Sequence, residues 1–186
     1  DLAVVHEQAR DITEAVKRTS AICRDLTRYA RRNGSREEVM VNLNTKLDEA
    51  LRIARYAVTL QDVTVVKRYA EEASVMGNPD ELLHVFVNLI TNAVQAIKDH
   101  GTLTLQTTVG PDGLVRASVS DTGCGIPKEA LSKIFEPLYT TKPPGKGTGL
   151  GLYNVMSVIS KMEGHICVDS DVGVGTTFRI EFPQVQ

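Results

Sequence analysis

Polar side chains recur at helical spacing inside a long apolar stretch, which predicts a buried helix with one polar stripe from about Pro79 to His100. The steps between these polar residues are four, four and three, so their side chains stack on one helix face. The stripe consists of His84, Asn88, Asn92 and Gln95. Most remaining positions are apolar, which leaves little surface suited to water. Asn78, followed by Pro and two acids, is a typical helix start, and we expect Gly101 to close the helix.

Apolar residues in the first part of the chain alternate at steps of three and four from Leu2 to Ala30, which is a heptad seam. Ile22 and Tyr29 widen the seam, so it suits a helix bundle better than a bare two-stranded coil. The segment supplies no other core, and we therefore expect a partner helix from a second chain. The alternative is an amphipathic helix that docks on its own domain.

The rest of the chain alternates helix and strand patterns. We expect a helix over 45–58 capped by Asn44, a strand over 64–69, a hairpin of 103–109 with 114–119, a helix over 152–162 and a hairpin of 165–169 with 177–182. This order predicts an α+β fold, a two-layer α/β sandwich with helices on one face of a mostly antiparallel sheet, preceded by the N-terminal heptad helix.

Charge and cysteine usage narrow the class of protein. Lys and Arg total 21 against 23 acids, a net charge of −2, so nothing attracts the chain as a whole to nucleic acid or to an anionic membrane. The basic residues that crowd the first helix are interpreted as a solvated face rather than a binding patch. Cys23, Cys124 and Cys167 lack metal-ligand spacing, which favours the reducing cytosol over a disulfide framework or a zinc site.

Hydropathy gives no sign of membrane insertion in this stretch of sequence. No apolar run approaches the length of a membrane span, and no signal peptide is visible. Because the chain begins at Asp1 without a methionine, we expect a fragment of a longer protein. That expectation leaves room for sensing or membrane parts upstream.

The carboxamides of the stripe point to a metal and a nucleotide. A buried amide needs a hydrogen-bond partner or another ligand. The side-chain oxygens of Asn88 and Asn92, one turn apart, suit a hard cation such as Mg2+, which keeps water and phosphate oxygens in its shell. A nucleotide is therefore the expected ligand.

A turn after the first hairpin has the sequence Asp121-Thr122-Gly123-Cys124-Gly125. An aspartate there can accept a hydrogen bond from an exocyclic amine, and the two glycines let the backbone approach a planar ring closely. The alternative interpretation is an ordinary Asp-Gly turn.

A glycine-rich loop from Tyr139 to Gly151 leads directly into a helix. Glycine-rich backbone and a positive helix end are what a polyphosphate needs. The spacing fits neither a Walker A loop, because Gly147 follows Lys146, nor the dinucleotide fingerprint, because Leu152 occupies its sixth position. We interpret the loop as a lid that orders over a ligand. A disordered surface loop is the alternative, but it explains neither the two lysines nor the helix that follows.

Together these three elements resemble the histidine-kinase branch of the GHKL superfamily, which also contains gyrase-type, heat-shock-chaperone and mismatch-repair ATPases. The matching motifs are Asn88 to Ala93 (N box), Asp121 to Gly125 (G1 box), Ile134 to Pro137 with Thr140 to Lys142 (F box), Gly147 to Leu152 (G2 box) and Gly173 to Phe178 (last glycine motif). The end of the N box is similar to that of nitrogen-regulation-type sensor kinases. The resemblance implies a Bergerat ATP-binding catalytic domain over 37–186 and part of a dimerisation and phosphoacceptor hairpin over 1–36.

The resemblance also implies a set of site residues. Asn92 would be the direct Mg2+ ligand with Asn88 beside it, and Asp121 would read the adenine amino group. Thr176 would support the adenine through water, and Lys142 with the glycine-loop backbone would hold the phosphates. The expected ATP-binding residues are Asn88, Asn92, Asp121, Gly123, Gly125, Lys142, Lys146, Gly147, Thr148, Gly149, Leu150, Gly151 and Thr176.

Three positions depart from the patterns of other branches. His84 stands where many kinases have Gln or Glu, and Gln95 stands where some have a phosphate-contacting Lys. Asn88 occupies the place of the glutamate that activates water in the hydrolysing branches, and an amide cannot act as a general base. We therefore expect slow hydrolysis and phosphotransfer to an external acceptor.

The implied function is that of a two-component sensor histidine kinase, which transfers the γ-phosphate of Mg-ATP to a histidine and onward to a response-regulator aspartate. The implied partners are a second copy of the chain, through the N-terminal helix, and a receiver domain. His6-Glu7 resembles the start of an acceptor box, but Arg10-Asp11 replaces its Asn-Pro, so we expect the acceptor helix outside this sequence. A degenerate kinase that acts as a nucleotide-sensing scaffold and a serine kinase of the anti-sigma type are the alternatives.

Overall fold

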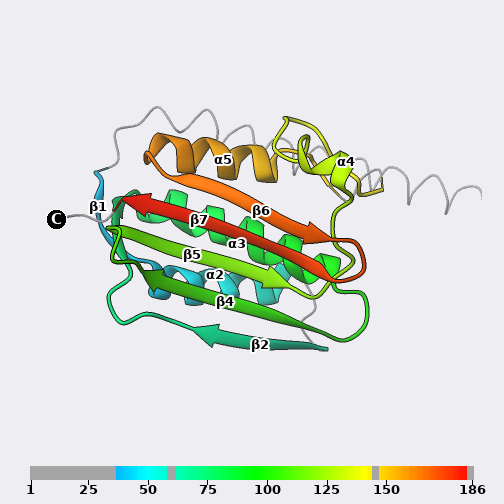
Figure 1. Cartoon of the computed structure of the whole chain (residues 1–186), viewed down its shortest axis with the longest axis horizontal. Helices are drawn as coiled ribbons and strands as arrows, with labels where there is room; N and C mark the ends of the chain where they lie inside the picture. Colours follow the sequence, from blue (N-terminus) through cyan, green and yellow to red (C-terminus); the bar gives the residue numbers. More distant parts are fainter. Residues whose placement is uncertain (1–36, 58–61, 144–146, 184–186) are drawn as a thin grey trace, which may run out of the picture.

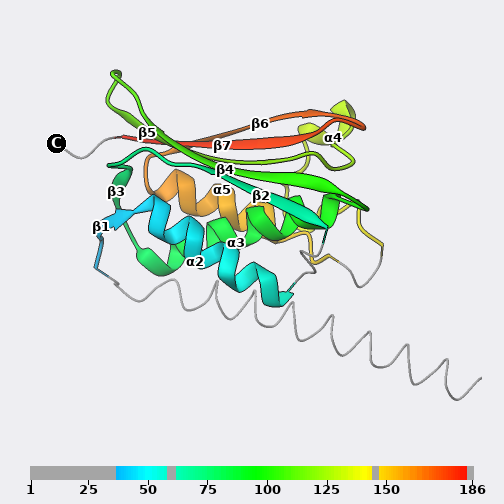
Figure 2. The same cartoon turned by 90° about the horizontal axis from the view of Figure 1, so that it is seen from below.

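A five-stranded sheet and a layer of helices on one of its faces form the domain (Figure 1, Figure 2). The computed structural model describes residues 37–57, 62–143 and 147–183. The helix layer contains α2 (Leu43–Ala57), α3 (Pro79–Ala96) and α5 (Gly151–Lys161). This arrangement confirms the predicted α+β two-layer sandwich. The heptad helix expected over 1–36 lies outside the described residues.

The sheet has the strand order β2-β4-β5-β7-β6, and only the β2–β4 pair is parallel. The strands are β2 (Val63–Arg68), β4 (Gly101–Val109), β5 (Leu114–Asp121), β6 (His165–Asp171) and β7 (Gly175–Pro183). Both predicted hairpins are confirmed, but each is longer than the sequence pattern indicated. The extension matters for the site, because it pairs Asp121 on β5 directly with Thr176 on β7.

The side chains of β5 alternate regularly between buried and half-buried. Its buried positions are Val115, Ala117, Val119 and Asp121, so the aspartate continues the row of core-facing residues. On the helix side of this core, Phe86 and Ile90 of α3 are fully buried. The central strand therefore places the carboxylate of Asp121 on the face of the sheet that the helices cover, beside the end of α3.

Helix α3 begins as predicted and ends earlier than predicted. The Asn78 Oδ1 accepts the backbone N–H groups of Asp80 at 3.0 Å and Glu81 at 3.1 Å, and a proline occupies the first turn. The predicted end at His100 is wrong, because Ile97 is extended (φ −81°, ψ 117°) and the last helical residue is Ala96. The cause is tertiary: the Ala96 carbonyl accepts the Cys124 N–H at 3.0 Å, and β4 starts at Gly101.

The predicted cap of α2 is also wrong. The helix starts at Leu43, and Asn42 caps it by accepting the Thr45 N–H at 3.0 Å. Asn44 instead lies in the first turn, where its side chain donates to the Ala70 carbonyl at 2.7 Å and accepts from the Thr107 hydroxyl at 2.6 Å. Two asparagines separated by one residue were equally suitable caps, and long-range hydrogen bonds decided between them.

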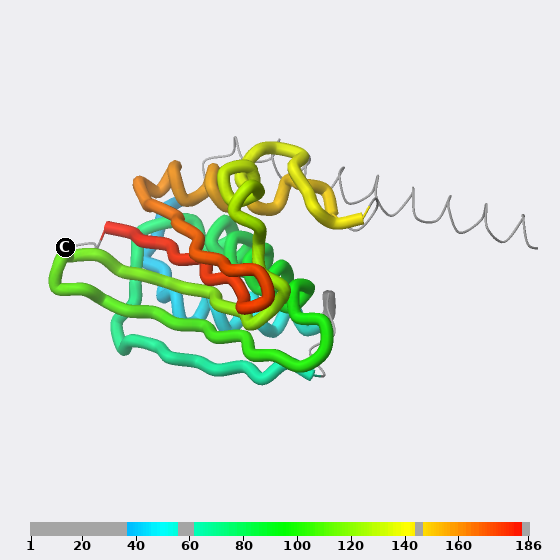
Figure 3. Tube along the Cα trace, turned by 45° about the vertical axis from the view of Figure 1, so that its right-hand side comes forward, coloured from blue at the N-terminus to red at the C-terminus, as the bar shows by residue number. Residues whose placement is uncertain are grey.

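Three short elements have no counterpart in the sequence prediction. β1 (Val39–Asn42) and β3 (Ser74–Gly77) pair antiparallel as a separate two-stranded sheet, and α4 (Lys128–Leu131) is a single turn. Each has only four residues, which is too short for a periodic pattern. In Figures 1 and 3, α4 and the segment that leads to α5 lie at the end of the domain where β6 turns into β7.

Candidate nucleotide-binding site

Asp121 ends β5 as a buried carboxylate that is only 6% exposed. Its Oδ1 accepts the Gly123 N–H at 2.8 Å, and the backbone of Thr176 also hydrogen-bonds to it. Burial raises the pKa of Asp121, and these two hydrogen bonds partly offset the increase. An ionised carboxylate has about four lone-pair sites, so Asp121 retains capacity for a donor on a ligand.

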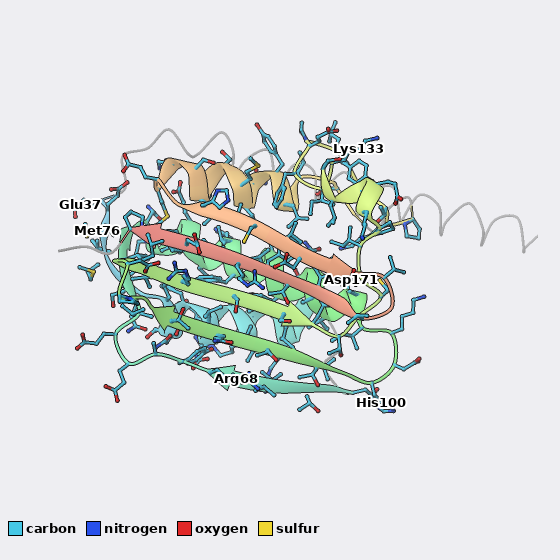
Figure 4. All side chains as sticks on the ribbon, in the orientation of Figure 1. Glu37, Arg68, Met76, His100, Lys133 and Asp171 are labelled. Atoms are coloured by element: carbon cyan, nitrogen blue, oxygen red, sulfur yellow. The ribbon has the colours of Figure 1, made fainter. Side chains whose placement is uncertain are left out.

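The glycines that follow Asp121 are required by close packing. A Cβ on Gly123 would lie 2.6 Å from the carbonyl carbon of Ala96, at the end of α3. Gly125 has φ +71°, and a Cβ there would overlap the carbonyl oxygen of Asp171, which Figure 4 labels at the end of β6. The loop is therefore packed closely between α3 and the β6–β7 turn, which leaves no room for a Cβ at either glycine.

Substituting Gly125 with alanine tests this packing. Gly113 has the same φ of +71° but nothing within 4 Å of an added Cβ, so Gly113→Ala is a control for backbone strain alone. We expect Gly125→Ala to weaken nucleotide binding at least tenfold in a calorimetric titration, because the overlap displaces the loop beside Asp121. Gly113→Ala should bind as the unmodified chain does. Equal affinities for the two variants would contradict the assignment of this loop to the site.

Ser170 supports the loop of the candidate site, and the sequence analysis missed it. Its hydroxyl accepts the Ile126 N–H at 2.8 Å, donates to the Gly175 carbonyl at 2.9 Å and lies 2.9 Å from the Thr176 hydroxyl. Because the Ser170 proton goes to Gly175, Thr176 is the donor in the last contact. Ser170 thus ties the loop after Asp121 to β7. Only the strand register, which pairs Ser170 with Thr176, could have revealed it.

Asn88 brings the polar stripe next to the start of α5. Its side-chain amide donates to the Gly151 carbonyl at 3.5 Å, a long hydrogen bond. Just before α5, the Thr148 hydroxyl accepts the Leu150 N–H at 3.3 Å. The positive N-terminal end of an eleven-residue helix therefore lies beside an asparagine of α3, which is a suitable place for an anionic phosphate.

A backbone hydrogen bond joins the two ends of the predicted lid. The Leu138 N–H donates to the Gly149 carbonyl at 3.0 Å, and both residues have positive φ, 67° and 69°. Phe135, just before the lid, packs edge-on against Phe178 of β7 with ring centroids 6.4 Å apart. The loop between 138 and 149 is thus anchored to the domain at both ends. Lys146 lies outside the described residues.

Lys142 extends from the lid to the polar stripe of α3. Its ammonium donates to the Asn92 Oδ1 at 2.8 Å and to the Gln95 Oε1 at 2.5 Å. Partial burial lowers the pKa of Lys142, because the charged form loses solvent. A cation is therefore already accepted by the side-chain oxygen that the resemblance assigns to Mg2+.

The donor set fits a nucleotide-bound Mg2+ better than an independent metal site. In the part of the chain that the structure describes, no group of three or more His, Cys, Asp or Glu residues could hold a metal ion. Asn92 instead offers a neutral oxygen to a cation, and Mg2+ typically completes its shell with phosphate oxygens and water. Asn92, with Asn88 beside it, would hold the metal when a nucleotide supplies the other ligands.

The predicted site residues converge along α3. Ala96 contacts the loop after Asp121, Asn92 lies about 6 Å back along the helix axis, and Asn88 about 12 Å back, at the start of α5. An adenine at the first position and phosphates over the other two would follow the helix. The structure thus defines a domain of the Bergerat ATP-binding type, in which the residues predicted to bind base and phosphates lie along one helix.

Comparison with known proteins agrees with this class. The family model described as histidine kinase-, DNA gyrase B- and HSP90-like ATPase matches residues 77–186, and the chain belongs to that family. The sensor kinase CckA of Brucella abortus is 33% identical over 208 residues, covering 100% of this chain and 22% of that protein. AtoS of Escherichia coli, a signal transduction histidine-protein kinase, is 37% identical over 144 residues, covering 77% and 23%.

A solved structure shares both fold and detectable sequence similarity. The nucleotide-free catalytic domain of histidine kinase ThkA has a TM-score of 0.71 and 27% identity, covering 81% of this chain and 100% of that one. The chain is thus an ATP-binding catalytic domain of the kind found in sensor histidine kinases. It spans less than a quarter of the length of CckA and AtoS. Within the described ranges, no helix is long and apolar enough to cross a membrane.

Proposed function

We propose that this domain transfers the γ-phosphate of Mg-ATP to a histidine on a dimerisation helix, from which it passes to the aspartate of a response-regulator receiver domain. The observation that carries the proposal is the convergence on α3 of a buried Asp121, the amides of Asn88 and Asn92, and the lysine of a lid. The homodimer through residues 1–36 belongs to the same proposal. So does a cytosolic location, which the free thiols of Cys124 and Cys167 suit.

The position of each residue along α3 decides whether it would contact the adenine or the phosphates. Asp121 would accept the adenine amino group, while Lys142 and the first N–H groups of α5 would orient the phosphates. Bound Mg2+ would neutralise charge on the phosphates and lower the barrier to transfer. Asn88 stands next to α5 and has no basic group, so it cannot remove a proton from an attacking water. The nucleotide would therefore persist until an external acceptor arrives.

Two measurements test the proposal. Calorimetric titration of ATP should show binding that strengthens on addition of Mg2+. The absence of any binding at millimolar ATP would contradict the proposal. Incubation of the protein at its full natural length with γ-labelled ATP should then yield acid-labile, alkali-stable phosphate. Acid-stable label would favour a serine kinase instead. Binding without any protein labelling would favour a nucleotide-sensing scaffold.

A further inference from the structure

The contact between the lid and α3 joins one cation to two neutral amides. Lys142 lies 50 positions from Asn92 in the sequence, and its ammonium donates to Asn92 at 2.8 Å and to Gln95 at 2.5 Å. The two amides are three residues apart on α3 and face the same way. An ammonium with two oxygen acceptors on one helix face resembles a metal ion between two ligands.

We propose that Lys142 holds the place of Mg2+ at Asn92 until the metal binds, and that Gln95 is the positioning residue that keeps the lysine there. The inference rests on the proposed function, because it needs Asn92 to be the metal ligand. Asn92 Oδ1 cannot serve both cations: Mg2+ needs an oxygen at about 2.0–2.1 Å, and an ammonium 2.8 Å from the same atom would crowd and repel it.

Gln95 is suited to this role by its place on the helix. It follows Asn92 by three residues toward the adenine end, away from Asn88 and the start of α5, where the phosphates are proposed to lie. Its side chain is exposed, whereas Asn92 is half-buried. It also makes the shorter of the two contacts with Lys142. Gln95 therefore retains the lysine without itself being a metal or phosphate ligand.

The arrangement links the arrival of Mg2+ to the release of Lys142 from Asn92. Mg-nucleotide can occupy Asn92 only in molecules in which Lys142 has left this side chain. The observed affinity therefore equals the intrinsic affinity multiplied by the fraction of such molecules. Once displaced, the ammonium is free to neutralise phosphate oxygens nearby. A nucleotide without metal does not compete for Asn92 and does not require this exchange.

The first experiment measures ADP binding by calorimetry across a series of Mg2+ concentrations and in EDTA, using the unmodified chain and Gln95→Leu. Loss of the Gln95 contact should lower the Mg2+ concentration that half-saturates binding about three- to tenfold and leave binding in EDTA unchanged. An unchanged or higher Mg2+ requirement, or weaker binding in EDTA, would overturn the inference. ADP avoids turnover, so the measurement does not depend on kinase activity.

A double-mutant cycle shows whether Gln95 acts through Lys142. In a Lys142→Met background, Gln95→Leu should have no further effect on the Mg2+ requirement. A direct contact between Gln95 and phosphate would instead give the same effect in both backgrounds. Lys133→Met is the matched control, because Lys133 is an exposed lysine near α4, on the outer side of the domain in Figure 4. It should leave the Mg2+ requirement unchanged.

A third measurement needs no nucleotide at all. In amide-correlation NMR spectra of the empty protein, Lys142→Met should move the side-chain amide signals of both Asn92 and Gln95, and Lys133→Met should move neither. Unmoved signals would show that the contact is absent in solution. If the chain bound no ADP under any condition, the proposed function would be wrong. If Mg-ADP bound normally and Gln95→Leu did not change this binding, only the role assigned to Lys142 would be wrong.

Discussion

Asp121→Asn is expected to weaken ATP binding about 30- to 100-fold while the chain remains folded. The variant keeps an oxygen for the Gly123 N–H, so the loop can retain its 2.8 Å hydrogen bond. It loses the charged acceptor for the adenine amino group, and a hydrogen bond to a charged group contributes about 1.5–3 kcal/mol. Calorimetric titration of ATP measures the loss directly.

Inosine triphosphate, which lacks the exocyclic amine, makes the test specific. The unmodified chain should prefer ATP to inosine triphosphate strongly, and Asp121→Asn should remove most of that preference. Asp169→Asn is the matched control, because Asp169 is an exposed carboxylate paired with Arg179 on the neighbouring strand. If Asp121→Asn kept the full preference for ATP, this aspartate would not be the residue that reads the base.

The same substitution has an opposite effect on stability. Burial raises the pKa of Asp121 above its ordinary value of 3.8, so the folded chain holds this proton more tightly than the unfolded chain does. Ionisation therefore lowers the free energy of unfolding as the pH rises from 3.8 through the raised pKa, and the Asn variant does not undergo this loss. The unfolding free energy of Asp121→Asn minus that of the unmodified chain should increase over this interval and then level off. A difference that fell with pH would contradict the assigned direction.

Asn92→Ala is expected to abolish the contribution of Mg2+ to nucleotide binding. With Mg2+ present, ATP should bind about 100-fold more weakly than to the unmodified chain, because the metal loses its protein ligand. In EDTA the affinities should differ little. Titration of ATP under both conditions separates these outcomes.

Thr91→Ala is the control for changes in α3 itself. Thr91 precedes Asn92, and its hydroxyl donates back to the Val87 carbonyl at 2.7 Å and the Asn88 carbonyl at 3.1 Å, within the same helix. Its removal should change ATP affinity less than about twofold. If Asn92→Ala still responded to Mg2+ as fully as Thr91→Ala does, the metal would have to lie elsewhere.

Much of the domain follows from local patterns in the sequence. The Asn78-Pro79 start of α3, its apolar faces and the alternation along β5 and β7 are local signals, and the sheet and helix layers result from burying them. The stripe on α3 predicted Asn88 and Asn92 in a common site for the same reason. Side chains three or four residues apart on one helix must lie together, whatever surrounds them.

Features that depend on tertiary contacts could not be predicted. The end of α3 is set by a hydrogen bond from Cys124, and the cap of α2 is set by the contacts of Asn44 with Ala70 and Thr107. Lys142 was expected to meet phosphates, but its contacts with Asn92 and Gln95 come from the path of the lid. These outcomes depend on which distant groups meet, and no periodic pattern encodes them.

The hydrogen bond between Leu138 and Gly149 has a practical consequence for engineering. Since the two residues meet at the neck of the loop, added chain between Pro143 and Gly147 would extend a segment whose ends are already held together. Lengthening a closed loop carries only a small entropic penalty, about 0.6 kcal/mol for each doubling. A peptide tag or small reporter inserted there should therefore leave the start of α5 in place.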